Sequence, residues 1–209
     1  MSRDISISSV VGNAWEYFKA NASVLIVALF IYVLISGAAG LMTDILESQP
    51  VLEFIASVIE TFLNLIMGLG FARILLDTVD NKEVKLNTLF ENRSPLIILH
   101  YVVGSILIGV IIIAGLILLV IPGIYLAARL SFLTYVLLEQ EDYDFLKAIS
   151  TSWEMTENHV WDLVGLGLVA FLIVVAGILA LGIGLIIAIP ITGVMSAIAY
   201  RALQTREQF

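Results

Sequence analysis

The chain has 209 residues, of which 60% are hydrophobic and 13% are charged, and its formal net charge at pH 7 is −8. A soluble domain of this length cannot bury so much apolar surface, so the composition predicts an integral membrane protein. Because the ten Lys and Arg are scattered, no basic face for nucleic acid can form. The absence of cysteine excludes disulfides and thiolate metal sites. The N-terminus lacks the pattern of a signal peptide, so we expect Met1 to remain on the mature protein.

The first predicted elements are an interfacial helix and a membrane span. Residues 6–18 place Val11, Trp15 and Phe18 on one helical face, which is typical of a helix that lies at headgroup depth. Residues 22–43 contain no Asp, Glu, Lys or Arg. At ~1.5 Å per residue, this segment is long enough to cross a hydrocarbon core of ~30 Å.

The second predicted span, about residues 51–76, carries polar side chains spaced along one helical face: Glu53, Ser57, Glu60 and Asn64. Such a stripe must face the bundle or water rather than lipid. One hypothesis is a polar cavity in the outer half of the membrane, with Glu60 opposite Arg129 as an ion pair or a ligand contact. The other is that the helix extends beyond the bilayer and leaves its carboxylates solvated.

Residues 94–128 contain no Asp, Glu, Lys or Arg and are too long for one helix. Pro122 and Gly123 predict a turn. The two spans on either side of it would cover residues 95–120 and 123–139. Arg129 then lies inside the fourth span, where an arginine costs a few kcal/mol unless it snorkels, pairs or lines a polar cavity.

Two polar connections follow the second and fourth spans. Residues 77–93 predict a loop with one interfacial turn of helix. In residues 139–162, an apolar i, i+4, i+8 series follows Asp144, which is placed to cap the helix; the series is Phe145, Ile149 and Trp153. An acidic run surrounds this cap: Glu139, Glu141, Asp142 and Asp144. It either binds a divalent cation or, as we expect, is a solvated loop that leads into the positive N-terminal end of the helix.

The last charge-free segment, residues 163–200, predicts two spans of about 162–182 and 185–203, with Pro190 inside the second. Small residues recur at every fourth position across the turn between these spans: Ala176, Ala180, Gly184 and Ala188. Such a face lets helices approach closely. We expect packing within the monomer, with a homo-oligomer face or a protein partner as the alternative.

These elements make one transmembrane domain, residues 1–209, of all-α class: six transmembrane helices in three hairpins, with short amphipathic helices on the cytoplasmic side. The three hairpin turns contain no Lys or Arg, whereas nine of the basic residues lie on the other side: Arg3, Lys19, Arg73, Lys82, Lys85, Arg93, Lys147, Arg201 and Arg206. The positive-inside rule therefore predicts a multi-pass protein of the cell membrane with both termini cytoplasmic.

Seven residues between positions 120 and 166 form a recognisable pattern: Pro122, Gly123, Arg129, Glu139, Ser152, Trp153 and Thr156. In this pattern the chain resembles the glycerophosphodiester phosphodiesterase membrane-domain family and related uncharacterised polytopic proteins of bacteria and archaea. The resemblance implies a polytopic membrane fold and a prokaryotic source. In some members this module is fused to a soluble phosphodiesterase domain that carries the catalysis, and the present sequence contains no such domain.

Enzyme motifs are missing from the sequence, which has no HExxH, no Gly-Lys-Ser phosphate loop and no serine on a shared helix face with either histidine. We therefore expect no catalysis, no cofactor and no bound metal. The predicted function is a non-catalytic membrane module that interacts with membrane lipids or with a partner protein. The alternative is a small transporter or lipid-handling protein that uses a cavity around Glu60, Asn64 and Arg129.

Overall fold

The computed structural model describes residues 6–91, 94–118, 120–140 and 144–207. Within these ranges the fold is helical and contains no strand; the elements are α1 (Ile7–Ile45), α2 (Pro50–Val79), η1 (Leu86–Phe90), α3 (Pro95–Leu118), α4 (Val120–Arg129), α5 (Leu133–Glu139), α6 (Phe145–Met155), α7 (Val160–Leu179) and α8 (Leu185–Glu207). Six segments are long and apolar enough to cross a membrane. The predicted all-α polytopic class is therefore confirmed.

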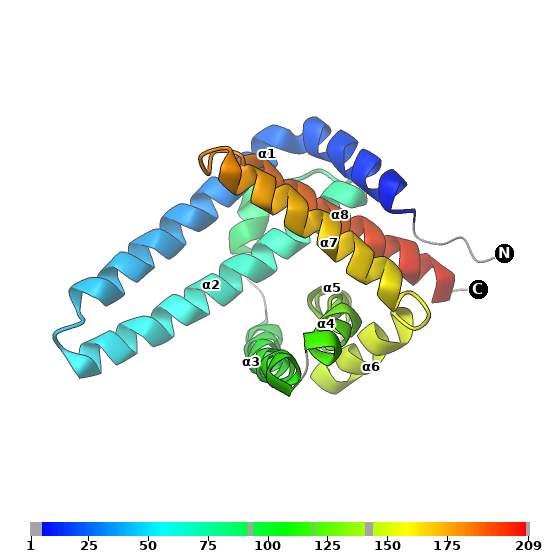
Figure 1. Cartoon of the computed structure of the whole chain (residues 1–209). Coiled ribbons are helices and arrows are strands. Elements are labelled where there is room, and N and C mark those ends of the chain that lie inside the picture. The colour runs from blue at the N-terminus through cyan, green and yellow to red at the C-terminus, as the bar shows by residue number, and fades with distance from the viewer. Residues whose placement is uncertain (1–5, 92–93, 119, 141–143, 208–209) are drawn as a thin grey trace.

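Three antiparallel hairpins organise the molecule: α1 with α2, α3 with α4, and α7 with α8. Figure 1 shows the α1/α2 hairpin as a long arm that leaves the other helices, while the start of α1 and the end of α8 lie at the opposite end of the molecule. Burial follows the same division, because buried residues end at Leu29 in α1 and begin at Met67 in α2. The core therefore lies at the end of the molecule that holds the start of α1 and the end of α8, where α2, α5 and α8 meet.

The predicted first interfacial helix and first span are a single helix, α1, with a kink at Asn21 (φ −123°, ψ 16°). The side chain of Asn21 donates to the carbonyl of Tyr17 at 3.2 Å. The buried face before the kink is shifted from the predicted one and consists of Val10, Ala14 and Phe18. Trp15, expected on that face, is 45% exposed and stacks on the ring of Phe18 at 5.8 Å, because the small Ala14 is the side chain that packs inward.

The predicted turn at Pro122 and Gly123 is wrong by a few residues. Helix α3 continues to Leu118 and α4 begins at Val120, so both residues lie in the first turn of α4. Proline is tolerated there because the first backbone N–H groups of a helix have no intrahelical partner. Gly123 instead serves helix packing, since a Cβ on Gly115 of α3 would lie 3.1 Å from its Cα.

The second interfacial helix is α6, and its predicted cap is confirmed. The Asp144 carboxylate accepts from the backbone N–H groups of Leu146 at 2.9 Å and Lys147 at 3.3 Å. Of the predicted face, Phe145 is buried, but Trp153 is 37% exposed. The interfacial turn expected between residues 77 and 93 is η1.

The α7/α8 hairpin turns at residues 180–184, where Leu181 (φ 58°) and Gly182 (φ 77°) adopt the left-handed conformation. The two helices approach closely at Gly177 and Gly184, because a Cβ on Gly184 would lie 2.7 Å from the Cα of Gly177. Gly184 and Ala188 of the predicted small-residue face thus pack within the monomer. Ala176 does not, because it is exposed.

Candidate functional site

The fourth span is two helices, because the helix breaks at residues 130–132. In an uninterrupted helix the backbone N–H of Leu133 would bond to the carbonyl of Arg129, but here it bonds to the carbonyl of Leu130 at 3.3 Å. The carbonyl of Arg129 is thereby released at the end of α4. A free backbone carbonyl at membrane depth is tolerated only if another group satisfies it.

Helix α6 supplies that group. The hydroxyl of Ser152 donates to the carbonyl of Arg129 at 2.9 Å. The hydroxyl of Thr156, at the C-cap of α6, lies 3.4 Å from the same oxygen but is closer to the carbonyls of Ser152 (2.9 Å) and Trp153 (3.1 Å). Both hydroxyls are fully buried, and that of Ser152 satisfies the end of α4.

The side chain of Arg129 makes the reverse contact. Its Nη1 donates to the backbone carbonyl of Trp153 at 2.8 Å, and its Nε donates to the hydroxyl of Tyr125 at 3.0 Å. The guanidinium also lies over the rings of Trp153 (4.7 Å) and Tyr125 (5.3 Å). A cation is favourable at the last turn of α6, where carbonyls lack helical partners. These contacts, which we call the Arg129 clamp, join the ends of α4 and α6 in both directions.

The hypothesis that Glu60 pairs with Arg129 is wrong. Glu60 accepts a hydrogen bond from Thr43 of α1 at 2.9 Å, and Asn64 accepts one from Ser36 at 2.6 Å. The predicted stripe does face protein at these two positions, but its partner is α1 rather than α4.

The other two stripe positions also lie apart from Arg129. The Ser57 hydroxyl donates to the carbonyl of Phe54 in its own helix at 2.8 Å, and Glu53 lies in the first turn of α2. The predicted cluster therefore does not form as a unit, because α1 lies along the polar face of α2.

A second polar cluster, which we call the Arg201 network, links α2, α5 and α8. Both carboxylate oxygens of Asp80 accept from Arg201 at 2.7 Å, and Arg201 also contacts Glu139 at 2.6 Å. Glu139 accepts further hydrogen bonds from Tyr200 (2.7 Å) and Gln204 (2.8 Å). Bidentate arginine pairs of this kind are strong and directional. Of these residues the sequence predicted only Glu139 as a site position, since no spacing rule connects three separate helices.

The electrostatics of the network are clearest at Asp80, which lies just beyond the second span. Burial raises the pKa of Asp80, but hydrogen bonds from Arg201 and Lys82 outweigh this effect and hold the pKa below its usual value. Asp80 is thus a stably ionised partner of Arg201.

Two carboxylates of the acidic run have partners within the protein. Glu139 is bound to Arg201, and Asp144 caps α6, so neither is free to join a cation site. Glu141 and Asp142 lie outside the described residues, as do Arg3 and Arg93. In the part of the chain that is described, no three His, Asp or Glu side chains gather as metal ligands would.

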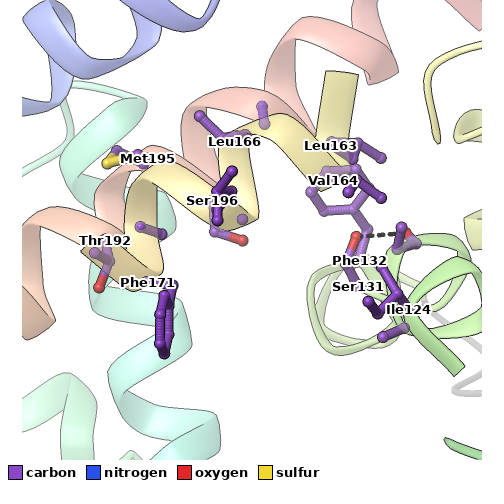
Figure 2. A pocket seen from close by; sticks show the side chains of 16 residues that line it. Ile124, Ser131, Phe132, Leu163, Val164, Leu166, Phe171, Thr192, Met195 and Ser196 are labelled. Atoms are coloured by element: carbon purple, nitrogen blue, oxygen red, sulfur yellow. Dashed lines mark hydrogen bonds between the residues drawn. The ribbon is translucent and has the colours of Figure 1, made fainter. Parts of the chain in front are cut away.

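An apolar groove of about 600 Å³ lies between the end of α4 and the α7/α8 hairpin. Figure 2 shows Phe171, Thr192 and Ser196 on one side of it and Ile124, Ser131 and Phe132 on the other. Its lining contains no Asp, Glu, His, Lys or Arg, and its polar groups are three hydroxyls: Ser131, Thr192 and Ser196. Ser131 donates to the carbonyl of Ala128 and Thr192 to that of Ala188, so both are satisfied within the protein.

The groove was not predicted from the sequence. Its walls come from helices far apart in the chain, and each wall carries ordinary span residues. The one residue that marks the groove in the sequence is the glycine at position 167. In the structure, a Cβ there would meet nothing within 4 Å. A glycine that packs against no neighbour leaves space, and here that space is part of the groove.

The fold, the clamp, the network and the groove define a multi-pass, all-α membrane protein. Comparisons of the chain with protein families, with curated proteins and with solved structures found no match. The resemblance in residues 120–166 therefore stays a prediction. Of its seven positions, the structure brings four together in the clamp and places the other three elsewhere: Pro122, Gly123 and Glu139.

Proposed function

We propose that this chain is a non-catalytic membrane module that holds a hydrocarbon chain of a membrane lipid in the groove between α4, α7 and α8. The observation that carries the proposal is the groove itself: about 600 Å³, apolar, and built on helices that are long enough to cross the membrane. Its volume lies within the ~300–1,000 Å³ range of small-molecule sites. The apolar lining of the groove suits a hydrocarbon chain, which needs no polar contact.

The surroundings of the groove favour a lipid as its occupant. Leu168 and Phe171, on its α7 wall, are 59% and 62% exposed, so the groove opens sideways between spans. At membrane depth, hydrocarbon chains are the medium outside this opening. Since lipid chains are as apolar as leucine, close packing rather than exclusion of water would hold a chain there.

The non-catalytic part of the proposal rests on the chemistry of the side chains. The groove lining lacks a general base, a charged electrophile and an acid, which enzymes place around a reacting atom. The hydrogen bonds of the Arg129 clamp go to the ends of α4 and α6, and those of the Arg201 network join its own members. These features support a binding module in the cell membrane with both termini in the cytoplasm, as the distribution of basic residues predicts.

No observation favours the transporter hypothesis in its original form. It needs Glu60, Asn64 and Arg129 around one cavity, whereas Glu60 and Asn64 bond to α1 and Arg129 bonds to α6. Lipid handling remains, but at the groove rather than at the polar stripe.

Native mass spectrometry of the protein released from mild detergent tests the proposal. We expect wild type to retain lipid adducts and Gly167→Leu to lose them by roughly tenfold or more, which corresponds to ~1.4 kcal/mol. A Cβ at this position meets no atom within 4 Å, so the leucine side chain starts in open space and extends into the groove.

The matched control is Gly37→Leu in α1. Gly37 also has nothing within 4 Å of its Cβ position, but it lies outside the groove. Equal adducts in wild type and both variants would refute lipid binding in the groove. Loss of adducts in both variants would refute it as well, because the effect would then not be specific to the site.

A further inference from the structure

The groove covers only half of the thickness of the bilayer. Its α7 wall runs from Leu163 to Phe171, the first half of a helix that continues to Leu179. Its α8 wall runs over the facing segment, from Ala199 back to Thr192. At ~1.5 Å per residue the α7 wall is ~12 Å long, close to half of a ~30 Å hydrocarbon core. The groove therefore has the depth of one leaflet.

The two ends of the groove differ in polarity. The Leu163 end adjoins the α6–α7 connection, where the His159 ring lies 3.2 Å from the Asp162 carboxylate. The Trp161 side chain beside them is 72% exposed, which is typical of an aromatic residue at headgroup depth. The Phe171 end lies in the middle of α7, next to exposed apolar residues such as Leu172. Charged side chains thus lie at one end only, since the Thr192 hydroxyl near the Phe171 end already donates to the carbonyl of Ala188.

We infer that the groove takes one chain of a lipid from a single leaflet, with the headgroup at the α6–α7 connection and the end of the chain beside Phe171. The opposite orientation would place a polar headgroup at mid-membrane, where the lining provides no free partner. A lipid from the other leaflet is excluded for the same reason. This inference rests on the proposed lipid-binding function and adds the direction and the leaflet.

The absence of cysteine from the chain makes a direct test possible, because one introduced cysteine takes a fluorophore at one place. Two groove residues of α7, seven positions apart, serve as reporters: Val164→Cys beside the α6–α7 connection and Phe171→Cys in the middle of the helix. The probe is phosphatidylcholine with a nitroxide quencher on one acyl chain, either next to the carboxyl end or at the methyl end. One probe molecule per protein is added in detergent, so that bulk lipid does not contribute.

We expect the carboxyl-end quencher to act more strongly on the reporter at position 164, and the methyl-end quencher on the reporter at position 171. The reversed order, or equal quenching of both reporters by both probes, would overturn the inferred orientation. Introducing Gly167→Leu into each reporter variant separates the two proposals. If this change leaves the quenching intact, lipid binding in the groove itself is refuted; if it removes quenching of the wrong order, only the orientation is refuted.

Discussion

At the scale of single residues, the Arg129 clamp shows how a broken helix is kept in a membrane. The break between α4 and α5 releases a backbone carbonyl, and the Ser152 hydroxyl of α6 satisfies it. The arginine in turn satisfies a carbonyl at the end of α6. Loss of Ser152 therefore leaves the buried Arg129 carbonyl with only the longer contact to Thr156, and loss of Arg129 removes its hydrogen bond to the Trp153 carbonyl.

Removing one clamp hydroxyl should therefore destabilise the protein. We expect Ser152→Ala to lower the free energy of unfolding by ~1–3 kcal/mol, the cost of leaving a buried hydrogen-bonding group without its partner. Ser150→Ala is the matched control, because Ser150 lies on the exposed side of α6 and its hydroxyl donates to Glu154 there. Thermal unfolding in detergent measures both, and equal melting temperatures would contradict the role of the clamp.

The separation of Glu60 from Arg129 has a testable consequence. Arg129→Ala should lower the melting temperature by removing the contacts with Trp153 and Tyr125, and Glu60→Ala should act separately through the lost bond to Thr43. Because the two residues share no partner, the changes in the double variant should add within ~0.5 kcal/mol. A double variant that regains the stability lost in Arg129→Ala would show instead that the two charges interact.

The Arg201 network makes the stability of the fold depend on pH. The pKa of Asp80 is lowered in the folded chain, so its ionised form stabilises the fold above the unfolded pKa of about 3.9. That contribution disappears as the pH falls through the folded pKa. We expect the melting temperature to fall on acidification below about pH 4, and to fall less in Asp80→Asn, which starts less stable at neutral pH.

The control for this titration is Glu16→Gln, since Glu16 pairs with Lys19 on the exposed surface. Exposed pairs contribute little, so its profile should follow that of wild type. A steep acid dependence that persists unchanged in Asp80→Asn would assign the effect to other carboxylates.

At the scale of elements, close approach of backbones fixes the hairpins. The α7/α8 contact at Gly177 leaves no room for a side chain, because a Cβ there would lie 3.0 Å from the backbone of Gly184. We expect Gly177→Leu to destabilise the protein by ~1–3 kcal/mol or more through overpacking. The melting temperature of this variant should be compared with that of Gly37→Leu, because a Cβ at position 37 meets no neighbour. Similar melting temperatures would show that the α7/α8 hairpin accepts the larger side chain without loss of stability.

The sequence predicts elements well where one physical rule decides them. Apolar runs of membrane length located the six spans, and the Asp144 cap located the start of α6. Each hairpin also follows an interfacial element, namely the start of α1, η1 or α6, as the predicted threefold arrangement requires. The break at residues 130–132 could not be predicted, because its sequence, Leu-Ser-Phe, has no Gly or Pro and the compensating hydroxyl comes from another helix.

The predicted site failed for a related reason. A helical stripe tells which side chains of α2 share a face, but not which helix covers that face. Here α1, the sequence neighbour, covers it through Thr43 and Ser36. Likewise, the bonds from Arg201 to Asp80 and Glu139 join positions on three different elements, which no local pattern connects.

At the scale of the whole molecule, the helices are tied together at one end and separate towards the other. The Arg201 network and the largest buried side chains, including Tyr200 and Phe132, lie where α2, α5 and α8 converge. The α1/α2 arm beyond Leu29 and before Met67 packs mainly against itself (Figure 1). The end that holds the start of α1 and the end of α8 is therefore the stable base from which the hairpins extend.

The length of the arm has a consequence for the membrane that surrounds it. Helix α2 has 30 residues and is ~45 Å long, whereas α7 has 20 residues and is ~30 Å long. One hydrocarbon core cannot contain both helices upright, so α2 must tilt, thicken the lipid around it or extend its charged ends, with Glu53 and Asp77, beyond the hydrocarbon. In each case the lipid around the arm meets a different helix length from the lipid around α7.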